Sequence, residues 1–408
     1  MSIALETGRI RKIDGGVTAP QGYRAAGVHC GIKASRKDLA LLASDRLATC
    51  AALFTSNAVK AAPVLVSQEK VQSGAAAAIV VNSGIANACT GAPGLADARE
   101  MAALTAHALG LSEEFVLVAS TGVIGVPLPM PDLRRGIPQV ARALSPEGGA
   151  DAAEAILTTD AFTKTAAAQV LLGGVPVTIG GMAKGAGMIH PNMATMLCFL
   201  TTDAVIPPQR LRRALRTATE RSFNRISVDG DTSTNDAVFC LANACAGNPP
   251  LVEDDESFAL FQSALTDVAE ALALQIVRDG EGASKVATLT LRGARSHEDA
   301  KRAATAIMTS PLVKTAVYGG EPNWGRIVAA VGRSGAAVDP DAIEMWIGGH
   351  LVVREGVAAT DDLSSAAEAM KRPAVEIALD LHLGNGTFTG WFSDLNENYV
   401  KLNSGYMS

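Results

Sequence analysis

Residues 180–204 read GGMAKGAGMIHPNMATMLCFLTTDA, and the rest of the chain is arranged around this stretch. Four glycines fall within its first eight residues, where they let the backbone turn and approach itself closely. An apolar patch begins at Met193 and continues through Cys198–Leu200, and it holds a single hydroxyl group, that of Thr195. A threonine in such a run is most often a strand residue bonded to a backbone carbonyl, so Thr195 is either a structural hydroxyl or a reactive one.

Length and composition indicate a globular protein. The 408 residues are 48% hydrophobic, which suffices for a substantial core in one large domain or two closely packed halves. The net charge is −6 and there is no lysine-rich tail, which argues against nucleic acid as a partner. Residues 1–16 hold no signal-peptide core, and no uninterrupted apolar run reaches the roughly eighteen residues of a membrane span. We therefore expect a cytoplasmic protein without a membrane partner.

The motifs of cofactor and metal sites are missing from the sequence. The six cysteines show neither C-x-x-C spacing nor a histidine at zinc-ligand intervals, so we expect small buried hydrophobic residues, with disulfides the less favoured alternative. Glycine and lysine occur together in KGAGM (184–188) and DGEGASK (279–285), but neither segment fits a phosphate loop. DGDTSTND (229–236) is reminiscent of a calcium loop yet lacks its glycine and distant glutamate, which favours a self-bonded polar loop. No cofactor and no metal are predicted.

Hydrophobic periodicity predicts interleaved strands and helices. Strands are expected at residues 76–81, 115–119 and 375–383, and helices at 97–109 and 152–157, from Pro207–Pro208 onward, and through 261–276. Arg210, Arg212, Arg213 and Arg216 fall on one of these helices, where a solvated basic side is favoured over an anion site. Because no clean βαβ repeat appears, the pattern favours an α+β layered sandwich over a doubly wound parallel sheet.

Blocks spread over nearly the whole chain resemble, in order, those of the ornithine/glutamate N-acetyltransferases, enzymes of arginine biosynthesis. Besides the central stretch, they are GVTAPQGYRAAGVHCGIK (16–33), VNSGIANACTG (81–91), ASTGVIGVPLP (119–129), SFNRISVDGDTSTNDAV (222–238), DGEGASK (279–285) and EPNWGRI (321–327). The resemblance implies a layered α/β/β/α-like sandwich, similar to the N-terminal-nucleophile hydrolases but topologically distinct from them.

Self-cleavage is the first property that the resemblance implies. The family's precursor is cut just before the threonine of an Ala-Thr-Met-Leu sequence, which matches Ala194 and Thr195 here. The products would be an α chain of residues 1–194 and a β chain of residues 195–408, intertwined in one catalytic unit and assembled as a heterotetramer of two α and two β chains. The freed α-amine of Thr195, with an ordinary pKa of about 7.7 to 8.0, would then serve as the base for its own hydroxyl.

Ping-pong transfer of acetyl from N-acetylornithine to glutamate is the second implied property, and Thr195 would carry the acetyl ester. Oxyanion donors would come from Thr121 and Gly122, while Lys184 would face a substrate carboxylate and Glu281 an amino group. The residues that the resemblance assigns to substrate are Thr158, Lys184, Thr195, Glu281, Asn403 and Ser408. Some family members also accept acetyl-CoA as a donor, and the sequence leaves that open.

Two departures and two alternatives remain. Ile85 replaces the family's usual asparagine and Ile189–His190 a smaller pair, which puts fine specificity in doubt. One alternative is an N-terminal-nucleophile aminopeptidase or amidohydrolase that delivers the acyl group to water. The other is a non-catalytic scaffold in which the glycine-rich loops only turn the chain.

Overall fold

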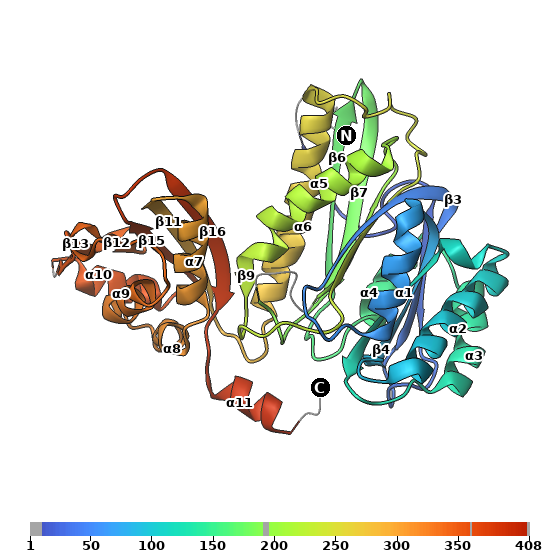
Figure 1. Ribbon diagram of the computed structural model, residues 1–408, viewed down its shortest axis with the longest axis horizontal. Coiled ribbons are helices and arrows are strands. Elements are labelled where there is room, and N and C mark those ends of the chain that lie inside the picture. The colour runs from blue at the N-terminus through green and yellow to red at the C-terminus, as the bar shows by residue number, and fades with distance from the viewer. Residues whose placement is uncertain (1–9, 191–195, 360, 406–408) are drawn as a thin grey trace.

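The chain forms a larger and a smaller lobe in the computed structural model, which describes residues 10–190, 196–359 and 361–405 (Figure 1). Within these residues the larger lobe is built on a nine-stranded sheet and the smaller on a seven-stranded sheet. The predicted cleavage site at Ala194 and Thr195 and the predicted substrate ligand Ser408 lie outside the described residues.

The sheet of the larger lobe mixes antiparallel and parallel pairs. In spatial order its strands are β1 (Arg11–Ile13), β6 (Lys164–Leu172), β7 (Val175–Lys184), β8 (Leu197–Thr202), β10 (Ala237–Ala242), β3 (Leu39–Phe54), β4 (Ala75–Ile85) and β5 (Val116–Val123), with β2 (Tyr23–Val28) paired to β3. The parallel pairs β4–β5 and β8–β10 are each connected through a helix, whereas the others are antiparallel.

The long strand β3 folds this sheet onto itself. Its first half pairs with β2 and β4 and its second half with β10, and the register shifts between Ala43 and Ala48. Side chains of both halves of the sheet, such as Phe199, Phe239 and Ile79, therefore meet in one core. The rings of Phe199 and Phe239 stack there with centroids 5.6 Å apart.

Helices cover both outer faces of the folded sheet. Helices α5 (Pro208–Arg221) and α6 (Glu256–Arg278) pack on the half that contains β6 to β8. Helices α1 (Ala62–Lys70), α2 (Gly91–Leu109) and α3 (Met130–Arg142) pack on the half that contains β2 to β5. The short helix α4 (Gly149–Ala155) contributes to the core between the two halves. The order of layers is α/β/β/α, which confirms the predicted layered α+β sandwich.

The smaller lobe is a sheet covered by helices on one face. Its strands, in spatial order, are β14 (Val357–Ala358), β13 (His350–Arg354), β12 (Glu344–Ile347), β15 (Ala374–Asp380), β11 (Val286–Ala294), β16 (Gly386–Ser393) and β9 (Ile226–Ser227). Its helices are α7 (His297–Met308), α8 (Pro311–Gly319), α9 (Trp324–Gly332) and α10 (Leu363–Met370). Strand β9 follows α5 in the chain, and Trp391 of β16 packs into the core of the larger lobe, so the two lobes are joined through this edge.

The predicted elements are present, but only some of their predicted ends are confirmed. Helix α2 ends at Gly110, whose φ of +67° closes the helix in the left-handed conformation that glycine favours. Strand β15 buries Val375, Ile377 and Leu379 on one face, as its alternation predicts. It ends at Asp380 and not at residue 383, because His382 adopts a φ of +52° and donates its N–H to Asp380. The prediction that His382 is exposed is right, but it lies in a turn.

Helix α6 is the one helix among the described residues that is long and apolar enough to cross a membrane. More than half of its apolar window, 56%, is buried inside the protein, however, as is typical of a core helix. Its Phe261, Leu265, Val268, Leu272 and Ile276 pack against the sheet in the predicted register.

Strands β7 and β8 bring the end of one predicted chain beside the start of the other. They are antiparallel neighbours, and Lys184 at the end of β7 is paired with Leu197 at the start of β8. Strands β8 and β10 follow Thr195 in the sequence, yet they lie between β7 and β3, which precede it. A break before Thr195 would therefore leave two chains that share one sheet.

Candidate active site

Helix α11 (Glu397–Ser404) returns from the smaller lobe toward the larger one (Figure 1). A pocket lies where this helix meets loops of the larger lobe. Its free volume of about 160 Å³ is room for a ligand several times larger than a water molecule. Every predicted site residue that the structure describes lines this pocket. They are Thr121, Gly122, Thr158, Lys184, Glu281 and Asn403.

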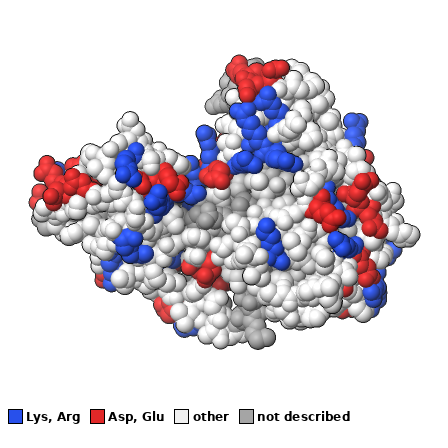
Figure 2. Space-filling view, in the orientation of Figure 1, with Lys and Arg blue, Asp and Glu red and all other residues white. Residues whose placement is uncertain are grey.

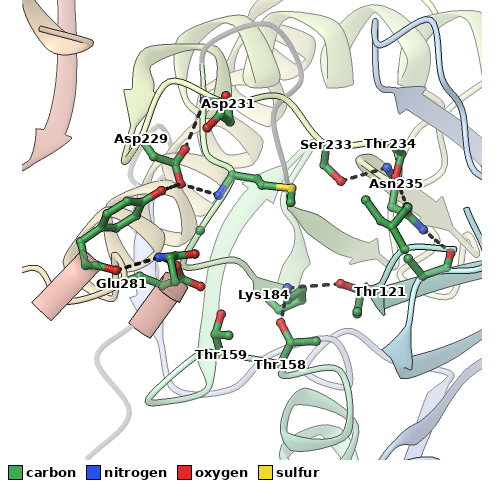
Figure 3. A pocket seen from close by; sticks show the side chains of 17 residues that line it. Thr121, Thr158, Thr159, Lys184, Asp229, Asp231, Ser233, Thr234, Asn235 and Glu281 are labelled. Atoms are coloured by element: carbon green, nitrogen blue, oxygen red, sulfur yellow. Dashed lines mark hydrogen bonds between the residues drawn. The ribbon is translucent and has the colours of Figure 1, made fainter. Parts of the chain in front are cut away.

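Lys184 occupies the floor of the pocket. Its side chain is buried, and Nζ donates to the hydroxyl of Thr158 at 2.7 Å and to that of Thr121 at 3.3 Å (Figure 3). The carboxylate of Asp160 lies 3.8 Å from Nζ. Burial lowers the pKa of Lys184, and the charge of Asp160 opposes this effect. Lys184 is therefore a buried lysine of the pocket and not a solvated surface residue.

Asp160 holds Lys184 and its neighbours in place. Its Oδ1 accepts from Lys164 Nζ and from the Gly185 N–H, both at 2.7 Å, and its Oδ2 accepts from the Thr158 N–H at 2.9 Å. Burial alone would raise the pKa of this carboxyl, but the charges of Lys184 and Lys164 hold it well below its ordinary value. Asp160 is therefore a buried carboxylate that fixes the two loops carrying Thr158 and Lys184.

Lys164 extends this network to a third loop. Its fully buried Nζ lies 2.5 Å from Asp279 as well as 2.7 Å from Asp160. Asp279 also accepts from the Ala161 N–H, and it precedes Glu281 by two residues. A buried pair of this kind holds only when every partner is present. The network thus ties together the three loops that carry Thr158, Lys184 and Glu281.

Glu281 and Asn403 form the side of the pocket nearest α11. Asn403 Nδ2 donates to Glu281 Oε2 at 2.8 Å, and the Glu281 N–H bonds to the Ala186 carbonyl at 2.9 Å. Gly187 packs so closely here that a Cβ on it would lie 2.6 Å from the Glu281 carboxyl group. The lack of a side chain at Gly187 therefore leaves room for the Glu281 carboxylate in this position.

Thr121 and Gly122 lie at the end of β5 on the opposite side from Glu281. Gly122 has a φ of +133°, and a Cβ there would lie 2.2 Å from the Gly84 carbonyl carbon in β4. Only glycine allows this approach of the two strands. The Thr121 hydroxyl is thereby held within hydrogen-bond reach of Lys184.

The polar loop at residues 229–236 is part of the site, which the sequence interpretation missed. It is partly self-bonded, as predicted: the Asp231 N–H donates to Asp229 and the Asn235 N–H to the Ser233 hydroxyl. Most of its side chains also line the pocket (Figure 3). Three carboxylates within eight residues were the signal that could have indicated a functional loop.

Asp229 anchors the chain that leads toward Thr195. Its carboxylate accepts the N–H groups of Met188 at 2.6 Å and Ile189 at 2.9 Å, and the Tyr399 hydroxyl at 3.3 Å (Figure 3). Burial raises the pKa of Asp229 to about 6, although these hydrogen bonds oppose the shift. A carboxyl that titrates near neutral pH therefore holds this loop.

Asp236 is a second buried carboxyl beside the central stretch. Its Oδ1 accepts the Met196 N–H at 2.9 Å, and its buried Oδ2 has no hydrogen-bond partner among the described residues. Burial raises its pKa well above the ordinary carboxyl value, and Lys184 opposes the shift. Met196 directly follows Thr195 in the sequence.

The two departures lie at different distances from the pocket. Ile85, the last residue of β4, is not among the lining residues, and its carbonyl accepts from Asn82. His190 directly precedes the residues that the structure does not describe, and burial lowers its pKa. Their effect on specificity stays a prediction.

The layered α/β/β/α fold carries a pocket in which a buried lysine meets threonine hydroxyls, carboxylates and an asparagine, a combination typical of an enzyme active site. The chain belongs to the ArgJ family, whose model matches residues 24–408. The family suggested by the sequence blocks is thereby confirmed.

Relatives that carry the family's name align over nearly the whole of this chain. The arginine biosynthesis bifunctional protein ArgJ of Symbiobacterium thermophilum is 52% identical and covers 96% of this chain and 98% of its own. That of Geobacter sulfurreducens is 51% identical and covers 95% and 99%. Among solved structures, ornithine acetyltransferase of Mycobacterium tuberculosis complexed with ornithine is 43% identical over 45% of this chain and 98% of its own, with a TM-score of 0.42.

Proposed function

We propose that this protein transfers an acetyl group from N-acetyl-L-ornithine to L-glutamate in arginine biosynthesis, through an acetyl ester on Thr195. Its place in the ArgJ family supports a role in arginine biosynthesis. The observation that carries the chemistry is the convergence of the predicted residues in one pocket, at the end of β7 and the start of β8. Thr195 lies two residues before β8 in the sequence.

The charges of the pocket suit substrates that are amino acids. The Lys184 ammonium would bind a substrate carboxylate, and the Glu281 carboxylate would bind an amino group, with Thr158 and Asn403 as further hydrogen-bond partners. Ser408, which lies outside the described residues, would complete the pocket from the C-terminus. N-acetylornithine and glutamate each carry a carboxylate, so one site can bind the acetyl donor and then the acetyl acceptor.

Self-cleavage would create the base that activates the nucleophile. The Thr195 hydroxyl attacks the Ala194 carbonyl carbon, the acyl group moves from nitrogen to oxygen, and water hydrolyses the resulting ester. The products are a new carboxylate at Ala194 and a free amine at Thr195. The pairing of β7 with β8 supports this step, because it would keep both chains in place after the cut.

Transfer would then proceed in two half-reactions. The Thr195 amine takes the proton of its own hydroxyl, the oxygen attacks the acetyl carbon, and the proton passes to the departing ornithine amine. The neutral amine of glutamate next attacks the ester and regenerates the threonine. Both steps pass through an oxyanion, which the Thr121 hydroxyl and the Gly122 N–H would stabilise, and losing one such donor costs about 2.7 to 4 kcal/mol in other enzymes.

Three further points belong to the proposal. The word bifunctional in the names of the relatives supports a second activity, for which we propose acetyl-CoA as an alternative donor. We propose the cytoplasm as the place of the reaction. We propose a heterotetramer of two α and two β chains as the active assembly, in keeping with the family resemblance.

The experiment that tests the transfer reaction varies the acceptor. Purified protein is incubated with N-acetylornithine, with and without glutamate, and the products are separated by chromatography. We expect N-acetylglutamate to form only with glutamate, with little free acetate. Rapid release of acetate without glutamate would support the amidohydrolase alternative instead, and the absence of any turnover would support the scaffold.

The pH dependence of kcat/KM should reflect the protonation of Asp229. Its carboxylate holds the Met188 and Ile189 N–H groups, and protonation weakens that hold, so we expect kcat/KM to fall as the pH drops through about 6. Asp229→Asn should show low activity without this acidic limb. Stability should change in the opposite sense: because folding raises this pKa from 3.8, the contribution of Asp229 is greatest below 3.8 and is lost as the pH rises through about 6.

Two measurements check this assignment. Rate profiles and urea unfolding are recorded from pH 5 to 8 for the wild type and Asp229→Asn. An unchanged acidic limb in the variant would show that another group controls it.

A further inference from the structure

A second pocket, which shares no lining residue with the candidate active site, lies between the two lobes. It forms where the end of α5 and the turn η3 (Phe223–Arg225) meet α7 and β16, and it measures about 290 Å³. Basic side chains gather over α5 in the upper centre of Figure 2. The cations that line the pocket are Arg216, Arg221 and Arg225 from the larger lobe and Lys301 from the smaller.

These four cations lack ion-pair partners within the described part of the chain. The one carboxylate in the lining is Glu220, and its Oε1 is engaged by Asn224 Nδ2 at 2.8 Å. Arg210 and Arg213 on the same helix differ, because both pair with Asp254, at 2.5 and 2.6 Å. The basic side predicted for this helix thus divides into a paired surface group and an unpaired group that faces a pocket.

Arg225 illustrates the unfavourable electrostatic energy of gathering these cations. It is half-buried over the Phe388 ring, with its guanidinium carbon 5.4 Å from the ring centroid. Burial lowers the pKa of Arg225 and the nearby charge of Arg221 lowers it further, while the carboxylates of Glu270 and Glu220 oppose the shift. Like charges around a partly desolvated cation are unfavourable, and an anion in the pocket would relieve the repulsion.

His297 lies beside Phe388 in the wall that α7 and β16 contribute. His297 Nδ1 bonds to the Thr387 carbonyl at 2.7 Å, and its ring packs 6.1 Å from that of Phe388. Because Phe388 is itself buried, the pocket offers cations and not an open aromatic face. The chemistry therefore favours a compact anion over a ligand recognised by a flat ring.

We propose that this inter-lobe basic pocket binds a compact phosphate-bearing anion. Guanidinium groups match phosphate oxygens with paired N–H donors, and several cations together favour a multiply charged group over a single carboxylate. The lining holds four cations against the single carboxylate of Glu220, a local excess of three positive charges in a protein whose overall charge is −6. A ligand held by Arg221 and Lys301 would bridge the lobes, and it would therefore stabilise the folded protein.

Calorimetry on the purified full-length protein tests the proposal, with inorganic pyrophosphate, inorganic phosphate, ADP and citrate as probes. We expect pyrophosphate to bind and to raise the melting temperature, and Arg221→Gln and Arg216→Gln each to weaken binding by about tenfold. Tighter binding of ADP would identify the phosphate as part of an organic molecule. Binding should also weaken as salt rises.

Arg213→Gln is the matched control, because Arg213 lies on the same helix but pairs with Asp254. Its affinity for pyrophosphate should equal that of the wild type. The proposal is overturned if pyrophosphate and ADP give no heat, if citrate binds as tightly as pyrophosphate, or if the pocket variants bind like the control.

Discussion

Thr195→Ala should yield one uncut polypeptide that does not transfer acetyl groups. The substitution removes the hydroxyl that would attack the Ala194 carbonyl, so no free threonine amine can form. Because the same residue would supply the nucleophilic hydroxyl and, after cleavage, the α-amine that acts as its base, we expect activity to fall by at least about 10⁴-fold. Denaturing mass spectrometry and the glutamate-dependent assay measure the two effects separately.

Thr195→Ser is the control for this experiment. It keeps a hydroxyl and an α-amine, so it should still be cut and should retain part of the activity. Strand β8 begins at Leu197, beyond the substituted position, and both variants should therefore fold. A cleaved or normally active Thr195→Ala protein would refute the proposed role of this residue.

Asp160→Asn should cause the second large loss, in both stability and activity. The carboxylate neutralises Lys164 and Lys184 in a buried site, and removing one partner from a buried ion pair costs about 3 to 5 kcal/mol. Lys184 and Thr158 would also lose their anchor. We therefore expect KM to rise and kcat to fall, beyond what the loss of folded protein explains.

The pH dependence of the unfolding free energy should show that the negative charge of Asp160 is the cause of the stability difference. The folded-state pKa of Asp160 is depressed, so its stabilising contribution is present above the unfolded value of about 3.9 and is lost as the pH falls below it. The difference in unfolding free energy between the wild type and Asp160→Asn should shrink accordingly. Asp254→Asn, which removes an exposed partner of Arg210 and Arg213, should change stability far less than Asp160→Asn. Equal effects of the two substitutions would contradict the account.

The sequence predicted local structure well where a local signal exists. Gly110 ends α2, and alternating side chains give β15 its buried face. The predicted substrate residues that the structure describes all line one pocket. Their assignment came from the family blocks along the whole chain and not from local patterns. Their convergence on Lys184 could not be derived from spacing, since Thr121 and Lys184 are 63 residues apart.

Contacts between distant segments escaped prediction. Asp160 and Asp279 share Lys164 in the fold, yet Lys164 and Asp279 are separated by 115 residues, and no local spacing links them. The inter-lobe pocket depends in the same way on β9 joining the sheet of the smaller lobe. Burial and ion pairing of this kind are decided by tertiary packing, which single-sequence patterns do not report.

The acetyl ester on Thr195 is the claim on which the account depends, and intact mass spectrometry tests it most directly. Protein incubated with N-acetylornithine alone should show a β chain that begins at Thr195 and carries one added acetyl group, which disappears when glutamate is supplied. Fully active protein in which no chain begins at Thr195, or in which that chain is never acetylated, would contradict it.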